Sequence, residues 1–216
     1  KPEQFQVWMK GRLIAQFPKR KLAELMAQRL KQFFYHSSNL ALKNAAVEPA
    51  FSNRLPVVKV GDRILYEVAE DLAKDLDRNG ELIAIEWANN LRMAIGQKPL
   101  ELADAQKKMH NLVETQKTFE GLASWYGPYF HGRVTATGET YNQHKFTAAH
   151  PSLPFDTYLK VENLENGHDV IVRINDRGPY VSGRTLDLSQ EAVRCLNGEK
   201  AGLVSFKAVI MQPSSN

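Results

Sequence analysis

The segment Asp169–Ser189, with the sequence DVIVRINDRGPYVSGRTLDLS, decides the fold expected for the C-terminal half of the chain. Its first part is an apolar run over Asp169–Asn175, which is typical of a buried strand. The run ends at Asp176 and an Arg-Gly-Pro turn, and a second short strand is predicted over Thr185–Leu188. Ser189 is a good N-cap, so a short helix is predicted to follow it.

Outward from this segment, the chain after residue 117 reads as short strands separated by Gly, Pro and Asn. Six strands are predicted, at Glu120–Tyr126, Lys145–Ala149, Tyr158–Asn163, Asp169–Asn175, Thr185–Leu188 and Ser205–Ile210. Six short strands in about 95 residues, with little helix between them, predict a compact all-β barrel. Residues 117–216 are therefore expected to form one barrel domain.

Residues 1–116 have a different texture, rich in Ala, Leu, Lys and Gln, and predict an α+β accessory domain. The expected elements are a strand or hairpin, a helix, a loop, two strands and two helices, at Phe5–Phe17, Lys21–Tyr35, Ser37–Ala50, Leu55–Val60, Arg63–Val68, Glu81–Ile95 and Leu100–Val113. Trp8 and Trp87 are expected in the core of this domain. Because no motif for chemistry occurs here, its function stays open.

The composition excludes several classes of protein. Lys and Arg number 28 against 24 Asp and Glu, and the excess lies within residues 1–116. So small an excess, with no recognition motif beside it, does not indicate nucleic-acid binding. The single cysteine, Cys195, excludes an internal disulfide. A membrane-spanning helix needs about 20 apolar residues in a row, and no apolar run in the sequence comes near that length.

Five segments of the C-terminal half form a characteristic series. They are GLASWYG at 121–127, FHG at 130–132 with TATGE at 135–139, TAAHPSLPF at 147–155, VRINDRGP at 172–179 and GRTLDLS at 183–189. In this order and spacing they resemble the RlpA (rare lipoprotein A) family of double-psi β-barrel lytic transglycosylases. The resemblance covers about residues 119–210 and extends, more distantly, to expansins, whereas the first 116 residues lie outside it.

The resemblance implies non-hydrolytic cleavage of the β-1,4 bond from N-acetylmuramic acid to N-acetylglucosamine in peptidoglycan, which leaves a 1,6-anhydromuramyl end. The C6 hydroxyl of the muramic acid can be the nucleophile because the sugar ring already holds it near the reacting carbon. One carboxyl group can then protonate the leaving oxygen and afterwards accept the hydroxyl proton. No cofactor and no metal site are expected, since the histidines lack the spacing of a known zinc motif.

Three residues are the catalytic candidates. Asp176 is chosen as the acid and base because the resemblance places a catalytic Asp in this string; the alternative is an Asp that caps the turn. Glu139 would position the sugar, help to keep Asp176 protonated or stabilise positive charge on the sugar, unless it is an exposed loop residue. His150 would bind substrate or a carboxylate, unless its role is structural.

Five further residues are predicted to bind substrate: Tyr126, His131, Arg177, Tyr180 and Asp187. The two tyrosines could stack on sugar rings. The arginine could meet the lactyl group of muramic acid or phosphate-bearing polymers, or pair with Asp176. Asp187 is either a second carboxyl group in the cleft, as in expansins, or a buried partner for Arg173 or Arg184.

Peptidoglycan glycan strands are thus the expected partner of the barrel. The N-terminal domain would bind envelope glycan, a divisome protein or another envelope protein. The expected location is the periplasm or outer envelope of a bacterium, reached by export with a signal peptide that these 216 residues do not include. The alternative function is a non-catalytic, expansin-like module that binds or loosens wall glycan.

Overall fold

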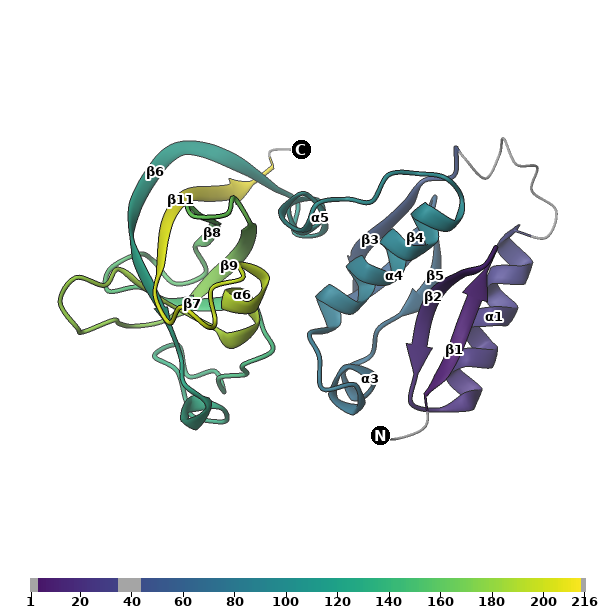
Figure 1. Ribbon diagram of the computed structural model, residues 1–216, viewed down its shortest axis with the longest axis horizontal. Helices are drawn as coiled ribbons and strands as arrows, with labels where there is room; N and C mark the ends of the chain where they lie inside the picture. The colour runs from purple at the N-terminus through teal and green to yellow at the C-terminus, as the bar shows by residue number, and fades with distance from the viewer. Residues whose placement is uncertain (1–3, 35–43, 215–216) are drawn as a thin grey trace. The chain divides into compact units, whose positions relative to one another are not determined.

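The computed structural model describes residues 4–34 and 44–214 of the 216-residue chain. The chain divides into two compact units, Lys1–Ala105 and Gln106–Asn216. The C-terminal unit contains a closed six-stranded barrel, and the N-terminal unit is built of two small sheets and helices (Figure 1). Both expected fold classes are therefore confirmed. In the part of the chain that the structure describes, no helix is long and apolar enough to cross a membrane.

The barrel is formed by six strands in the order β10-β6-β11-β8-β9-β7. They are β6 (Leu112–Trp125), β7 (Thr147–Ala149), β8 (Tyr158–Asn163), β9 (Asp169–Asp176), β10 (Leu186–Leu188) and β11 (Val204–Pro213). The β10–β6 and β7–β9 pairs are parallel, and the other pairs are antiparallel. Every predicted strand is present, and closure leaves the sheet without an open edge.

The largest difference from the sequence prediction lies at the start of the barrel. Residues 112–114 already belong to β6, where they pair with Met211–Pro213 of β11. Gln106 joins the same unit, because its side-chain amide donates to the carbonyl of Ile171 at 3.0 Å and accepts from the Ile171 N–H at 2.7 Å. The first part of β6 is mostly exposed, so its polar composition resembled a connector. The contacts thus place residues 106–116 with the barrel unit rather than with the residues before them.

Gly121 allows β6 and the segment before β10 to approach closely. A Cβ atom at this position would overlap the side chain of Thr185. Without it, the Thr185 N–H donates to the carbonyl of Leu122 at 2.8 Å, and Leu186 pairs in register with Ala123. The glycine that opens the GLASWYG segment therefore has a packing reason.

The short helix α6 (Gln190–Cys195) follows β10, as expected. Ser189 is its N-cap, and the Ser189 hydroxyl accepts a hydrogen bond from the Ala192 N–H at 3.3 Å. Ser189 is fully buried, and its own N–H donates to the carbonyl of Thr147 on β7. The cap thus fixes the end of β10 against β7, close to the strand end that carries Asp176.

The N-terminal unit contains nine elements within its described residues. They are β1 (Phe5–Met9), β2 (Arg12–Phe17), α1 (Arg20–Phe34), β3 (Val47–Ser52), β4 (Leu55–Val60), β5 (Arg63–Glu67), α3 (Glu70–Asp75), α4 (Gly80–Ala94) and α5 (Leu102–Met109), the last of which ends in the barrel unit. The first two strands form a hairpin, and the next three form an antiparallel sheet in the order β3-β4-β5. The predicted hairpin, helices and strand pair are all present.

The loop expected in this unit is wrong over its last residues. The loop expected over Ser37–Ala50 lies outside the described residues at 37–43, but Val47–Ala50 belongs to β3. Pro49 lies within β3 although proline cannot donate a ladder hydrogen bond. It is tolerated because β3 lies at the edge of its sheet, and Val47 is fully buried there. The short helix α3 was also not expected.

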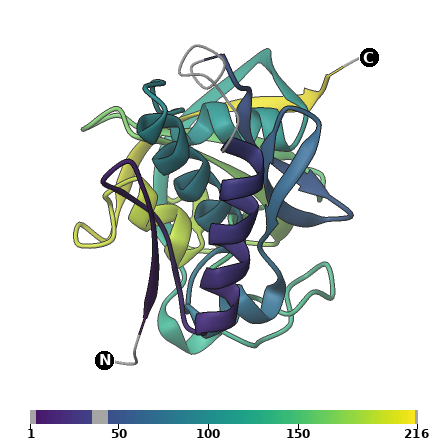
Figure 2. The ribbon, with the colours of Figure 1, turned by 90° about the vertical axis from the view of Figure 1, so that its right-hand side faces the viewer.

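An aromatic cluster lies at the centre of the N-terminal unit. The ring centroid of Trp87 on α4 lies 4.8 Å from that of Phe17 and 5.5 Å from that of Tyr66. Helix α1 packs on β1, β2 and β5, and Figure 2 shows the β1–β2 hairpin beside this upright helix. Trp87 is thus a core residue, as expected. Trp8, which faces outward from β1 and is 57% exposed, is not.

Candidate active site

The carboxylate of Asp176 lies at the end of β9 and accepts three hydrogen bonds. The backbone N–H groups of Ala136 and Arg177 each donate to Oδ1 at 2.8 Å. The hydroxyl of Tyr126 donates to Oδ2 at 2.9 Å. In the described part of the chain, no Lys or Arg side chain pairs with this carboxylate. Asp176 is therefore held by neutral donors on both oxygens.

Tyr126 carries its hydroxyl to Asp176 from the segment that follows β6. The ring of Tyr126 contacts Tyr141 at a centroid distance of 4.7 Å and Phe130 at 5.5 Å. Burial raises the pKa of Tyr126 far above its usual value, and the nearby negative charge of Asp176 raises it further. The hydroxyl therefore keeps its proton and remains available to the carboxylate at all ordinary pH values.

Asp187 is the second acidic side chain of this region. It lies on β10 directly opposite Ser124 of β6, and the Ser124 hydroxyl donates to Asp187 Oδ1. Neither Arg173 nor Arg184 pairs with it in the described residues. A Cβ added at Gly178 would lie 3.8 Å from Asp187 Oδ2, so the turn after Asp176 passes close to this carboxylate. The interpretation as a second carboxyl group near Asp176 fits this geometry.

Glu139 is bound in a quite different way. Both of its oxygens accept from the guanidinium of Arg173, at 2.9 Å and 2.7 Å, and the Asn175 amide donates to Oε2 at 3.0 Å. The hydrogen bonds from Arg173 lower the pKa of Glu139. Glu139 is therefore a fixed anion rather than a proton donor. Arg173 also binds Asp156 at 2.7 Å.

The pairing of Glu139 anchors the loop that reaches Asp176. Within this loop, the Thr135 N–H donates to the carbonyl of Glu139 at 2.8 Å, which closes a tight turn. The turn contains Ala136, whose N–H donates to Asp176. Because Arg173 and Asn175 both lie on β9, the Glu139 fork ties this turn to the strand that carries Asp176.

His150 and Arg177 hold the segment that follows β7. The Nδ1 atom of His150 accepts from the N–H groups of Ser152 and Leu153, so its neutral ring carries the proton on Nε2. Burial lowers the pKa of His150, and the positive charge of Arg177 lowers it further. The Arg177 guanidinium donates to the carbonyls of His150 and Leu153, at 3.2 Å and 2.9 Å. These contacts favour a positioning role for both side chains.

His131 is set apart from the Asp176 group. It is exposed, its Nδ1 accepts from the Gln143 N–H at 3.3 Å, and its ring lies 6.2 Å from that of His144. No contact described in the structure joins it to Asp176. Across the residues that the structure describes, no group of three or more His, Cys, Asp or Glu side chains could hold a metal ion.

Two exposed aromatic side chains contact residues next to the Asp176 carboxylate: the turn that follows it and the tyrosine that binds it. Tyr180 is 86% exposed and follows the turn at Gly178, where an added Cβ would lie 3.9 Å from the Tyr180 ring. Phe130, 45% exposed, contacts the ring of Tyr126, whose hydroxyl binds Asp176.

Several contributors to this site were not singled out from the sequence. Ser124 is found only through the β6–β10 pairing, and Ala136 contributes a backbone N–H that no residue type reveals. Arg173 was considered only as a partner for Asp187, whereas it binds Glu139. Its alternation with the buried residues of β9 was the one available signal that it faces away from the barrel core.

Comparison with known proteins places these residues in a family. A family model described as lytic transglycolase matches residues 118–208. The probable endolytic peptidoglycan transglycosylase RlpA of Synechocystis is 40% identical over 169 residues, which cover 74% of this chain and 53% of that protein. The protein of the same name from Aquifex aeolicus is 52% identical over 96 residues, covering 44% of this chain and 42% of that one.

The matches cover only part of each protein. This chain spans about half the length or less of the curated relatives it matches. Because the barrel unit makes up about half of the chain, the match over 74% of it extends into the N-terminal unit. Among solved structures, an expansin of Clavibacter michiganensis is 22% identical with a TM-score of 0.38, covering 46% of this chain and 53% of that one.

Proposed function

The chain belongs, through its C-terminal barrel, to the RlpA family, and from this premise we propose that it is a peptidoglycan lytic transglycosylase. The proposed reaction cleaves the β-1,4 bond between N-acetylmuramic acid and N-acetylglucosamine and leaves a 1,6-anhydromuramyl end. The observation that carries the proposal is the Asp176 carboxylate, which lies at a strand end and accepts hydrogen bonds from neutral donors on both oxygens.

The hydrogen bonds of Asp176 support an assignment of which carboxylate oxygen carries the catalytic proton. Oδ1 accepts from two backbone N–H groups and is therefore an acceptor in both protonation states. We propose that the catalytic proton resides on Oδ2, which faces the Tyr126 hydroxyl. A hydroxyl can donate to a carboxylate and accept from a carboxylic acid by rotating its hydrogen. Tyr126 can thus stay bound to Asp176 before and after each proton transfer.

The proposed reaction needs one acid and no protein nucleophile. Asp176 gives its Oδ2 proton to the glycosidic oxygen, and the bond from that oxygen to C1 of the muramic acid breaks. The C6 hydroxyl of the same sugar then forms a bond to C1 and releases its proton to Asp176. The acid is regenerated, and no water is consumed. The intramolecular attack supplies the proximity that a second carboxylate supplies in ordinary glycosidases.

Glu139 and His150 are proposed to act by positioning. Glu139 is an anion bound by Arg173, and it fixes the turn whose Ala136 N–H reaches Asp176. His150 orders the segment after β7 through its Nδ1 atom, while its backbone N–H donates to the carbonyl of Asp176 at 3.2 Å. Loss of either side chain would move a hydrogen-bond partner of Asp176 rather than remove a reacting group.

Substrate contacts are proposed for Tyr180 and Asp187. The turn at Gly178 lies near both side chains, because an added Cβ there would come within 4 Å of the Tyr180 ring and of Asp187 Oδ2. A sugar ring that stacks on Tyr180 could donate its hydroxyls to the Asp187 carboxylate. Tyr126 would serve the acid rather than the sugar, and His131 and Arg177 would contribute less to substrate binding than the sequence indicates.

The substrate sets the expected surroundings of the protein. A chain that cuts peptidoglycan acts in the bacterial envelope, so we place it in the periplasm or outer envelope. The N-terminal unit is proposed to bring the barrel to envelope glycan or to an envelope protein such as a divisome component.

The test is to incubate the full chain with intact sacculi and with peptide-stripped sacculi and to identify the soluble products by mass. Anhydromuramyl ends in either digest support the proposal, and the comparison shows whether stem peptides must be removed first. Products with reducing ends would indicate a hydrolase and overturn it. Binding to sacculi with no soluble product would also overturn it, in favour of an expansin-like module that binds or loosens glycan.

A further inference from the structure

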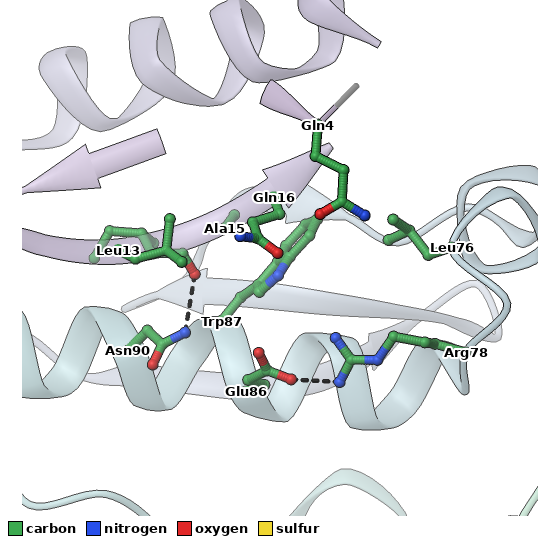
Figure 3. A pocket seen from close by; sticks show the side chains of 10 residues that line it. Gln4, Leu13, Ala15, Gln16, Leu76, Arg78, Glu86, Trp87 and Asn90 are labelled. Carbon is green, nitrogen blue, oxygen red and sulfur yellow. Dashed lines mark hydrogen bonds and ion pairs between the residues drawn. The ribbon is translucent and has the colours of Figure 1, made fainter. Parts of the chain in front are cut away.

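The N-terminal unit contains a small pocket that the proposed chemistry of the barrel does not use. Its volume is about 100 Å³, and it lies between β2, the middle of α4 and the segment after α3. Ten residues line it: Gln4, Leu13, Ile14, Ala15, Gln16, Leu76, Arg78, Glu86, Trp87 and Asn90. All of them belong to the same compact unit, and Figure 3 shows their side chains around the indole of Trp87.

The indole of Trp87 is the most informative part of this lining. Trp87 is only 3% exposed, yet its Nε1–H finds no hydrogen-bond acceptor among the residues that the structure describes. Nε1 itself is not among the buried side-chain atoms that lack a partner, so this N–H is open to the pocket that Trp87 lines. A carbonyl oxygen of a bound molecule would supply the missing acceptor at this point.

The other polar side chains of the lining add carboxamides, which offer both hydrogen-bond donors and acceptors. Asn90 donates through Nδ2 to the carbonyl of Ile14 at 3.1 Å, which leaves its Oδ1 as an acceptor. The carboxamides of Gln4 and Gln16 also line the pocket and have no hydrogen bond to another described residue. Arg78 and Glu86 form an ion pair at the same pocket, so their charges cancel. The lining therefore favours a neutral group that both donates and accepts.

We propose that this pocket binds the acetamido group of an N-acetylated amino sugar. The acetamido carbonyl would accept from the Trp87 N–H, its N–H would donate to a carboxamide oxygen, and its methyl would contact apolar neighbours such as Leu13 and Leu76. The small volume suits a group that ends in a methyl, whereas a main-chain peptide group continues in both directions. That the sugar belongs to peptidoglycan rests on the proposed function, but the acetamido chemistry rests on the pocket alone.

The test compares two neutral β-1,4-linked tetrasaccharides with the full chain. Tetra-N-acetylchitotetraose carries an acetamido group where cellotetraose carries a hydroxyl, and neither contains the muramic acid that the barrel would cleave. The readout is the indole ¹H–¹⁵N resonance of Trp87, distinguished from those of Trp8 and Trp125 by single substitutions to Phe. A saturable shift with the acetylated sugar and none with cellotetraose is the expected result.

Gln16→Ala removes one carboxamide from the pocket and is expected to weaken that binding about tenfold, as loss of one hydrogen bond would. Gln6→Ala is the matched control, because Gln6 lies on the neighbouring strand and binds Trp8 instead. No shift with the acetylated sugar, an equal shift with cellotetraose, or an unchanged affinity in Gln16→Ala would overturn the proposal.

These outcomes are independent of the barrel chemistry. Failure to release anhydromuramyl ends from sacculi would overturn the proposed reaction and leave the pocket result standing. Conversely, a chain that releases them but shows no Trp87 shift would retain the reaction and lose the acetamido site.

Discussion

Asp176 and Glu139 are two carboxylates at β9 that differ in their hydrogen-bond donors, which are neutral for Asp176 and include a cation for Glu139. Asp176 accepts hydrogen bonds only from neutral donors, namely two backbone N–H groups and the Tyr126 hydroxyl. Glu139 receives a bidentate guanidinium from Arg173. Such a cation favours the charged form of its partner, so Glu139 stays an anion. A carboxyl group that must give and regain a proton is better served by the neutral donors around Asp176.

The largest expected effect comes from Asp176→Asn. The asparagine oxygen can still accept from the two backbone N–H groups, so folding is expected to persist, but the side chain can no longer transfer a proton. Release of anhydromuramyl products is expected to fall about 10²–10⁴-fold, the range typical of a lost general acid. The measurement is product release from sacculi, quantified by mass, with thermal unfolding as the control for folding. Digestion at the wild-type rate would refute the assignment of Asp176.

The second effect tests the neutral donor itself. Tyr126→Phe removes the hydroxyl from Asp176 Oδ2 while the ring keeps its contacts with Tyr141 and Phe130. We expect kcat to fall about 10–100-fold, because the acid loses the one group that orients its proton-bearing oxygen. Tyr141→Phe is the matched control. It removes a hydroxyl from the same aromatic cluster without touching Asp176 and is expected to change kcat less than threefold. Equal effects of both variants would contradict the role given to Tyr126.

The third effect tests the charged partner. Glu139→Gln weakens the fork to Arg173 and loosens the turn that carries Ala136, so we expect a smaller loss in kcat, about three- to tenfold. Asp156→Asn is its control, because Asp156 binds the same guanidinium but is 74% exposed and lies outside that turn. A loss in Glu139→Gln as deep as that in Asp176→Asn would make Glu139 a reacting group and end the distinction between the two carboxylates.

Much of the barrel could be predicted because its strands are short, apolar and separated by turn residues. The strand Tyr158–Asn163 was predicted with its observed bounds, and Ser189 caps α6 as its sequence position indicates. The start of β6 could not be predicted, since an exposed strand that pairs with the distant C-terminal residues has no apolar alternation to reveal it. Edge strand β3 was also not predicted, because its sequence contains a proline and shows no sustained apolar alternation.

The site was predictable in its residue types but not in its partnerships. A resemblance in five segments pointed to Asp176, Glu139 and His150, yet nothing local indicates that Arg173 binds Glu139 across 34 positions of sequence. The backbone donor from Ala136 is invisible in a sequence because every residue except proline carries one. Pairings of this kind depend on the parallel and crossed connections of the barrel rather than on any single segment.

The smallest expected effect concerns stability and pH. Because the folded-state pKa of Glu139 lies below its ordinary value of 4.5, its pairing contributes stability that is fully present above about pH 4.5. That contribution is lost as the pH falls through the lowered pKa. The Glu139 side chain is 44% exposed, so solvent screening limits the contribution to about 1 kcal/mol. Thermal unfolding of the wild type and of Glu139→Gln should therefore differ slightly at neutral pH and converge in acid.

The difference in stability between the wild type and Glu139→Gln does not contain the contribution of His150, which is also sensitive to acid. The pKa of His150 is also lowered, from 6.5, so both proteins lose stability as the pH falls below that value. The loss is common to both and cancels in the difference, which should stay constant between about pH 7 and pH 5. A difference that already shrinks in that interval would mean that Glu139 is not held as an anion by Arg173. Glu139 would then not differ from Asp176 in being held by a charged partner.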